Sequence, residues 1–214
     1  MRSDVLIVAS RDRLARIECR GGIQARHSDG DTVHLVSTAA TPLGGDTVSV
    51  RVIVEPGARL RLRSVAATVA LPGHATPTSE SRWDCVVGGH LDVDLEPTIV
   101  ATVSRHLSAI RLEVADGGRV RWRERVQIGR HGEGQGFWSG SLHADAAGKP
   151  LLRHRVELGS GSLAHDELDA PLAYVSELRY PDLCFDAPGT RLALAGGGSL
   201  VTWQGPRLVN LNSL

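Results

Sequence analysis

The sequence has few of the features that would support a disulfide framework, a thiolate metal site or an electrostatic nucleic-acid interface. Its three cysteines, Cys19, Cys85 and Cys184, are far apart and never form a C-x-x-C pair. We therefore expect neither disulfides nor a zinc site and favour a reducing compartment. Basic and acidic residues number 24 each, which gives a net charge of zero. The chain thus lacks the positive charge of a protein that binds nucleic acids electrostatically.

Long apolar segments are missing as well. The apolar run at residues 5–9 is preceded by Asp4 and followed by Arg11 and Arg13. It is too short and wrongly flanked for a signal peptide. No stretch approaches the roughly 20 apolar residues of a membrane-spanning helix. We expect a cytoplasmic protein without a membrane segment, and a length of 214 residues is compatible with a single domain over residues 1–214.

Motifs of nucleotide and acyl hydrolysis are also absent. The glycine-rich segment 129–136 lacks the Lys-Ser/Thr pair of a phosphate-binding loop. No G-x-S-x-G nucleophile elbow occurs anywhere in the chain. The sequence by itself predicts a protein that is not an enzyme.

Alternation of apolar and polar residues with a period of two is the strongest pattern that is present. In residues 47–54 the valines at even positions share one face, and polar residues lie on the other, as in a half-buried strand. A turn at residues 55–57 follows, and residues 59–63 again alternate leucine with arginine. The pattern returns at residues 110–114 and 119–123. Each pair of strands is predicted to form a hairpin with one solvated face.

Turns recur at nearly constant spacing along the chain. Those at Gly57, Gly88, Gly117 and Gly148 are 31, 29 and 31 residues apart, which is typical of stacked supersecondary units. A β-sandwich built from regular hairpins would produce the same spacing. The pattern therefore favours an all-β chain and leaves both arrangements open.

One helix is predicted, close to the C-terminus. Asp169 is a candidate N-cap, and the following residues include a proline suited to the first turn. Apolar residues then recur at Leu172, Val175 and Leu178, and Pro181 would end the helix. We therefore expect a small helical part near the C-terminus.

Two acidic residues stand out by their positions. Asp46 follows Gly44-Gly45 at the start of a strand. It could form an Asx turn in an ordinary loop or present a carboxylate beside exposed backbone N–H groups. Glu124 shares the apolar face of its strand with Trp122, where a carboxylate must be paired, hydrogen-bonded or directed at a metal ion. An ion pair with an arginine and a bulge that turns Glu124 outward are the structural alternatives.

Five short motifs follow one another along the chain in a characteristic order. They are Thr41-Pro42-Leu43-Gly44-Gly45-Asp46, Glu55-Pro56-Gly57-Ala58, residues 91–97, Trp122-Arg123-Glu124, and a loop that contains Gly129, Arg130, Gly132 and Glu133. Each motif alone is weak. Their order and spacing over roughly residues 30–160 resemble the urease accessory protein D family (UreD, called UreH in some organisms).

The resemblance implies a β-helix-like stack of strands and a non-catalytic maturation factor. Members of the family form a complex with the accessory proteins UreF and UreG, bind apo-urease and help to deliver nickel to its active site. No tightly bound cofactor is implied, but nickel would pass transiently. Asp46, Glu124 and Glu133 are the acids at family-matching positions, and carboxylates would hold a divalent ion weakly enough to release it.

Two other functions remain open at this point. A β-rich interaction module without a metal role would need none of these acids. A β-helical hydrolase would need several inward-facing carboxylates on successive coils, and the alternation places only Glu124 in that way.

Overall fold

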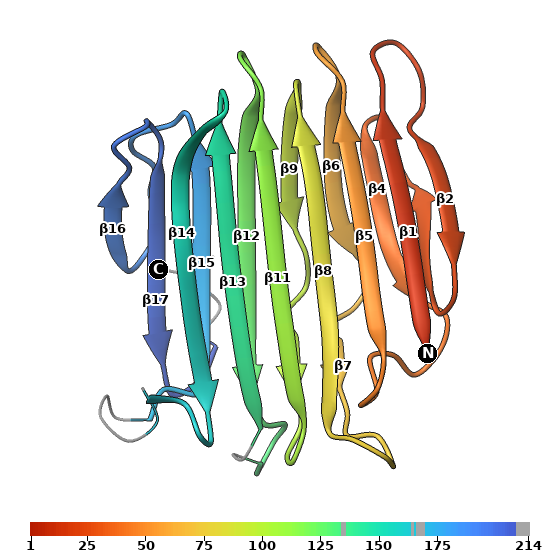
Figure 1. Cartoon of the computed structure of the whole chain (residues 1–214), viewed down its shortest axis with the longest axis vertical. Helices are drawn as coiled ribbons and strands as arrows, with labels where there is room; N and C mark the ends of the chain where they lie inside the picture. The colour runs from red at the N-terminus through yellow and green to blue at the C-terminus, as the bar shows by residue number, and fades with distance from the viewer. Residues whose placement is uncertain (134–135, 164, 166–169, 209–214) are drawn as a thin grey trace.

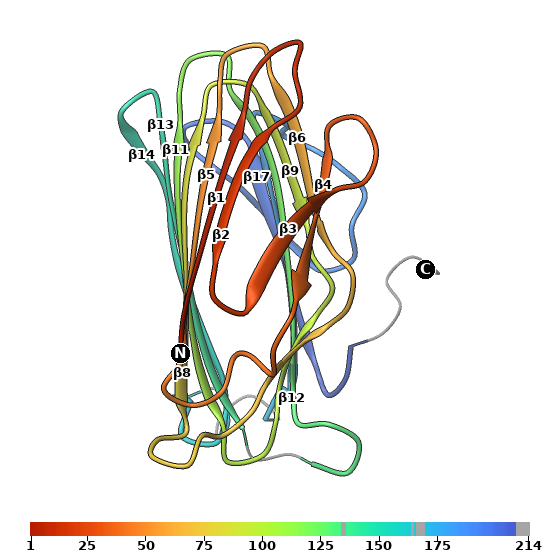
Figure 2. The same cartoon turned by 90° about the vertical axis from the view of Figure 1, so that its right-hand side faces the viewer.

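Nearly all of the described chain belongs to strands or to the turns between them (Figure 1). The computed structural model describes residues 1–133, 136–163, 165 and 170–208. The strands form two sheets, A and B, which face each other as two layers when seen edge-on (Figure 2). The prediction of an all-β chain is confirmed.

Sheet A has seven strands and is mostly parallel. In spatial order it consists of β14 (Lys149–Gly159), β13 (Phe137–Ala146), β11 (Arg105–Val114), β8 (Thr78–Val87), β5 (Thr47–Val54), β1 (Arg2–Ala9) and β2 (Arg16–Arg20). The central strands β13, β11, β8, β5 and β1 run parallel to one another. The edge strands β14 and β2 run antiparallel to their neighbours.

Sheet B has ten strands. Its main path consists of β16 (Thr190–Ala193), β17 (Ser199–Gly205), β15 (Ala173–Tyr180), β12 (Arg119–Ile128), β9 (His90–Asp94), β6 (Arg59–Ser64), β4 (Thr32–Ser37) and β3 (Ile23–His27). Two short strands extend it: β10 (Thr98–Val100) pairs with β12, and β7 (Thr68–Ala70) pairs with β10. Strands β4, β6, β9 and β12 are parallel.

From β4 to β13 the chain passes back and forth between the two sheets in a solenoid-like path of about four turns. Each return to sheet A lays the new strand beside and parallel to the previous one. Val50 pairs with Trp83, Trp83 pairs with Ile110, and Ile110 pairs with Leu142. Each coil contains about as many residues as separate two successive turns. The constant turn spacing therefore reflects stacked coils, as the resemblance implies.

The predicted hairpins are wrong. Strands β5 and β6 belong to different sheets, and so do β11 and β12. The turn between them carries the chain across the core, so both strands keep an apolar inward face and a polar outward face. A hairpin would show the same alternation, which is why the pattern could not separate the two arrangements.

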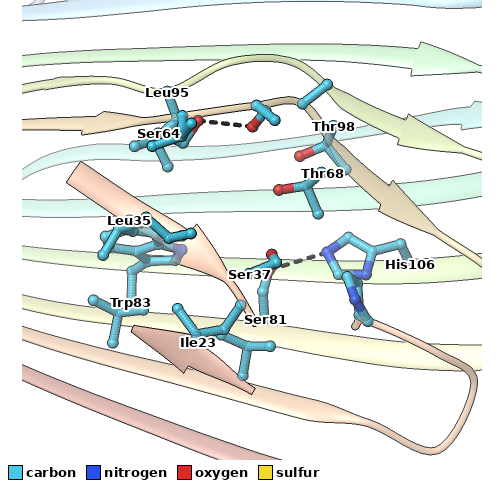
Figure 3. A pocket seen from close by; sticks show the side chains of 17 residues that line it. Ile23, Leu35, Ser37, Ser64, Thr68, Ser81, Trp83, Leu95, Thr98 and His106 are labelled. Carbon is cyan, nitrogen blue, oxygen red and sulfur yellow. Dashed lines mark hydrogen bonds between the residues drawn. The ribbon is translucent and has the colours of Figure 1, made fainter. Parts of the chain in front are cut away.

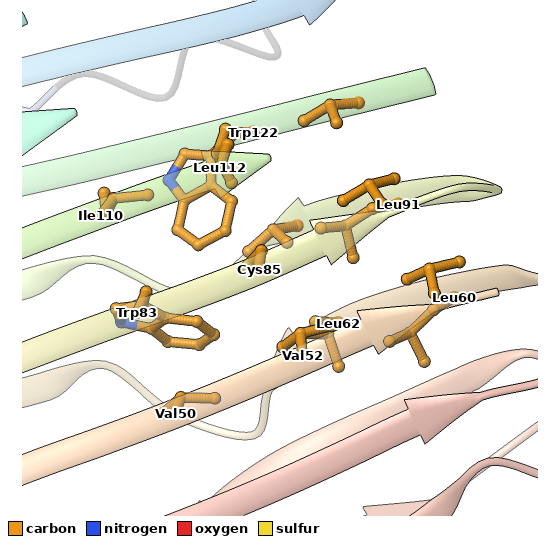
Figure 4. Packing of buried hydrophobic residues seen from close by; sticks show 14 of the residues in the cluster. Val50, Val52, Leu60, Leu62, Trp83, Cys85, Leu91, Ile110, Leu112 and Trp122 are labelled. Atoms are coloured by element: carbon orange, nitrogen blue, oxygen red, sulfur yellow. The ribbon is translucent and has the colours of Figure 1, made fainter. Parts of the chain in front are cut away.

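The core lies between the sheets and consists of the residues that the alternation turns inward. Val52, Leu62, Leu91 and Leu112 are fully buried. Figure 4 shows how side chains of successive coils pack side by side, with Trp83 of sheet A against Trp122 of sheet B. The two indole rings meet edge to face, with centroids 5.3 Å apart. Full burial of a side chain such as leucine contributes about 1.5–3 kcal/mol, so this stack of small contributions holds the layers together.

The predicted C-terminal helix is also wrong. Residues 173–180 form strand β15, which pairs with β12 and β17, and Asp169 lies outside the described residues. Six consecutive residues, 173–178, are buried, so β15 is covered on both faces and its apolar residues do not alternate. Helical geometry within the described ranges is confined to Leu163 and His165, and none of it could cross a membrane.

Candidate functional site

A set of polar side chains lies inside the solenoid, between the two sheets. Glu124 of β12 projects inward from sheet B, and His106 and Ser108 of β11 project inward from sheet A. Together with Trp83 and Trp138 they line a small cavity of about 60 Å³. Glu124 is therefore partly buried and lines this cavity.

Glu124 has a single hydrogen-bond donor. The Ser108 hydroxyl donates to a Glu124 carboxylate oxygen over 3.2 Å, and no arginine pairs with Glu124 among the residues that the structure describes. Burial raises the pKa of Glu124 to about 7, and the bond from Ser108 only partly opposes this rise. Near neutral pH this acid exchanges a proton readily, and the two structural alternatives for it, an arginine pair and an outward bulge, are not what the structure has.

His106 is held in a neutral form beside this acid. The Ser79 hydroxyl lies 2.9 Å from Nδ1 of His106, and the Ser81 hydroxyl lies 3.2 Å from Nε2. The side chain is 3% exposed, and burial lowers its pKa to about 4. A neutral imidazole and an ionisable carboxyl are both groups that bind divalent transition metals.

A further line of polar groups continues from Glu124 toward the surface. The negative charge of Glu124 contributes, after burial, to a raised pKa of Tyr174. The Tyr174 hydroxyl lies 2.9 Å from Nε2 of His154, which is only partly buried on the edge strand β14. Burial lowers the pKa of His154 as well. Polar side chains thus extend from the interior of the solenoid to one edge of sheet A.

His106 and Ser108 were missed in the sequence, although a signal for them exists. Both lie on the apolar face of a strand with period two, together with Ile110 and Leu112. The same signal singled out Glu124 on the next strand. What the sequence does not show is that these faces meet across the core.

Asp46 is engaged in holding its own loop. Its carboxylate accepts hydrogen bonds from the Leu43 N–H and the Thr41 hydroxyl, each over 2.9 Å, and forms an ion pair with the Met1 ammonium group. Burial opposes ionisation, but these partners hold the pKa of Asp46 below its usual value. Both turn-like hydrogen bonding and a carboxylate beside backbone N–H groups are therefore present.

The two glycines before Asp46 allow a close approach between loops. A Cβ on Gly44 would lie 1.8 Å from the Thr76 carbonyl oxygen, and Gly73 is in similar contact with Gly44 from the other side. Gly45 has φ +91°, which favours glycine. This motif fixes the start of β5 against the segment before β8.

Glu133 is tied to the loop that contains it. The Arg130 guanidinium donates to it over 2.6 Å, and the backbone N–H groups of Arg130 and Thr102 donate over 3.1 Å each. Hydrogen bonds from Arg130 and Thr102 lower the pKa of Glu133 to about 2. Gly129 and Gly132, both with φ +76°, permit the tight turn that brings these groups together.

The three predicted acids thus have different surroundings, and the structure does not gather them into one site. Across residues 1–133, 136–163, 165 and 170–208, no group of three or more His, Cys, Asp or Glu side chains is placed to hold a metal ion. Of the three, Glu124 alone faces an internal cavity. It is also the acid that no cation neutralises.

Another buried acid, Glu177, lies on the opposite face of sheet B. It is 3% exposed and accepts hydrogen bonds from Arg121 (2.9 Å), Arg123 (3.0 Å) and Arg179 (2.6 Å). Burial raises its pKa, but Arg121 and Arg179 outweigh this effect and lower it. Arg121 also contacts Asp92 and Asp94 on β9, so Glu177 belongs to an extended ionic network.

Comparison with known proteins identifies the family. The family model for the UreD urease accessory protein matches residues 6–176. The chain belongs to this family. The curated relatives include Urease accessory protein UreD 1 of Saccharopolyspora erythraea, 42% identical over 147 residues, and Urease accessory protein UreD of Frankia alni, 42% identical over 183 residues. The matches cover 68% and 74% of this chain.

The chain spans about three fifths of the length of these two relatives. It spans 58% of the Saccharopolyspora protein and 61% of the Frankia protein. A third relative, Urease accessory protein UreD 3 of Streptomyces griseus, is 33% identical over 187 residues, with 83% of this chain and 72% of the relative covered. Asp46, Glu124 and Glu133 lie within the range of the chain that the family model matches.

Proposed function

We propose that this chain is a non-catalytic urease maturation factor that binds apo-urease together with UreF-like and UreG-like partners and assists the delivery of nickel. Its membership of the UreD urease accessory protein family supports the role in maturation. The enclosed, unpaired Glu124 supports the part that concerns nickel. In this proposal nickel is cargo, and the chain contributes groups that hold it briefly.

The interior of the solenoid has the chemistry of a weak metal path. Glu124 offers carboxylate oxygens, and the neutral imidazoles of His106 and His154 lie along the same line of polar side chains. Nickel accepts imidazole and carboxylate ligands. Because Glu124 has a pKa near 7, an arriving cation would replace a proton instead of breaking an existing ion pair.

Asp46 and Glu133 are less suited than Glu124 to bind nickel in this path. Each would have to release cationic and backbone partners before it could bind nickel. We therefore propose Glu124 as the principal nickel-path residue, and Asp46 and Glu133 as secondary ones whose replacement affects the loops first.

The test is complementation of a urease-producing host from which its own UreD gene has been deleted. The wild-type chain, Glu124→Gln and a matched control, Glu113→Gln, are compared. Glu113 lies on the exposed face of β11. Three readouts are needed: capture of the soluble complex with UreF-like protein and apo-urease, the nickel content of purified urease, and urease activity.

We expect Glu124→Gln to retain the complex but to lower urease nickel content and activity together, with Glu113→Gln at the wild-type level. If the Glu124→Gln variant forms the complex and urease is still fully loaded with nickel, the proposed nickel path through Glu124 is wrong. The role as a maturation factor would then remain. Failure of the wild-type chain to restore urease or to bind any component would contradict the maturation role itself.

A further inference from the structure

A second pocket is distinct in character from the cavity at Glu124, and it opens to the surface beside Val65, which is 64% exposed. It has a volume of about 350 Å³ and lies between the sheets near β4, β5, β8 and the segment that leads to β7. It adjoins the smaller cavity, since Ser81, Trp83 and His106 line both. Its size falls at the lower end of the range for small-molecule sites.

The walls of this cavity are largely apolar at one end and polar at the other (Figure 3). Leu35 and Trp83 lie close together at the apolar end, and Val48 and Val50 of β5 also line the cavity. His106 lies at the opposite end, beyond Ser81. A ligand with an apolar body and one polar group would match this division.

The polar end offers hydrogen bonds but no charge. Among the residues that the structure describes, His106 is the only ionisable one that lines the cavity, and burial keeps it neutral because its pKa is lowered to about 4. The Ser81 hydroxyl has one bond to His106 and retains capacity for another, since a hydroxyl can donate once and accept twice. A charged group bound beside the buried His106 would be left without a counter-charge, which is costly where water is excluded.

We propose that this cavity binds a small, uncharged molecule with an apolar body and a single hydrogen-bonding group, which contacts Ser81 at the polar end. The volume corresponds to about ten non-hydrogen atoms, because a water molecule in the liquid occupies about 30 Å³. The site does not use Glu124, although it shares His106 with the smaller cavity at Glu124.

The proposal is tested with 2-naphthol, which has a naphthalene body and one hydroxyl, and with the anion 2-naphthoate. Calorimetric titration of the purified chain is expected to give saturable binding of 2-naphthol at one site. We expect 2-naphthoate to bind at least about tenfold more weakly, because its charge has no partner in the cavity.

Two variants locate the site. Val48→Phe fills the cavity from β5 and should abolish binding, whereas the matched control Val86→Phe places the same side chain on the outer face of β8, where Val86 is 40% exposed. Ser81→Ala removes a hydroxyl without adding bulk and should weaken 2-naphthol binding at least about threefold. Thermal unfolding confirms that each variant is folded.

Several results would overturn the proposal. They are the absence of saturable binding up to the solubility limit of 2-naphthol, equal affinity for 2-naphthoate, and unchanged binding by a folded Val48→Phe variant. If Val48→Phe does not fold, unchanged binding by Ser81→Ala decides against the proposal in its place. Glu124→Gln should leave 2-naphthol binding within about twofold, so failure here and failure of the nickel path are distinguishable.

Discussion

Glu124 and Glu177 are enclosed acids on adjacent strands of one sheet, yet their surroundings are opposite. Glu177 lies on the outer face of sheet B and accepts hydrogen bonds from three arginines. Glu124 lies on the inner face and accepts one hydrogen bond from a serine. The pKa of Glu177 is lowered, and the pKa of Glu124 is raised to about 7.

The difference shows that burial alone does not decide what a carboxylate does. Burial raises the pKa of both acids, and only the arginines reverse this effect at Glu177. A carboxylate that is permanently charged and fully paired serves the fold. A carboxylate that is enclosed, unpaired and poised near neutral pH is available for protons or cations, and this contrast is the physical basis of the proposal that Glu124 holds nickel.

The largest effect is expected at Glu177. Replacing Glu177 by Gln leaves Arg121, Arg123 and Arg179 without their shared anion, and loss of one partner from a buried ionic network costs about 3–5 kcal/mol. Urea unfolding at pH 7 measures the change. Glu113→Gln, exposed on sheet A, should change the free energy of unfolding by less than about 0.5 kcal/mol. If both variants lost a similar, small amount of free energy of unfolding, the contrast between Glu177 and Glu124 would be wrong.

The next effect is a pH dependence that belongs to Glu124. Its pKa is about 7 in the folded protein, whereas the ordinary pKa of a glutamate is 4.5. The folded chain therefore binds more protons than the unfolded chain between these values. The free energy of unfolding therefore falls as pH rises through this window, by roughly 3 kcal/mol in total. Glu124→Gln lacks this contribution.

Unfolding of Glu124→Gln and of the wild type at pH 5 and pH 8 isolates the contribution of Glu124 to the free energy of unfolding. The variant should gain stability relative to wild type as the pH rises, because only the wild type then has to bury a charge. A constant difference between the two proteins over this range would mean that Glu124 is ionised or neutral throughout, and the contrast with Glu177 would disappear.

The smallest effect is expected when the hydrogen-bond donor of Glu124 is removed. This substitution sharpens the comparison between Glu124 and Glu177. Ser108→Ala deletes the hydroxyl that donates to Glu124 and should raise its pKa further above 7, a change worth about 1 kcal/mol or less. Titration of the Glu124 carboxyl by carbon-13 NMR measures the shift. Ser49→Ala, on the outer face of β5, should leave that titration unchanged.

Much of the fold could be predicted from local patterns, and the two failures, the hairpins and the C-terminal helix, have separate causes. Alternation placed β5, β6, β11 and β12 and their inward faces. It did not separate a hairpin from a crossing between sheets, because both give the same alternation. At β15, burial on both faces removed the period of two, and the spacing of Leu172, Val175 and Leu178 was compatible with a helix.

For the candidate site, the sequence identified the acid but not its surroundings. Glu124 stood out because it shares an apolar face with Trp122. Its neighbours His106 and Ser108 lie on β11, which belongs to the other sheet, so nothing in the spacing along the chain connects them. Asp46 and Glu133 were identified through their motifs, and the structure shows which groups donate hydrogen bonds to their carboxylates.

The sequence by itself determined the inward faces of strands such as β5, β6, β11 and β12 and a repeat of about 30 residues, because side-chain direction in a strand is a local property of the backbone. The tertiary structure decided which strands pair and which groups surround each enclosed carboxylate. Stacking of successive coils brings together residues that are distant in the chain, such as Val50, Trp83 and Ile110. The charge of a buried acid depends on such neighbours, and so the different roles of Glu124 and Glu177 exist only in the folded protein.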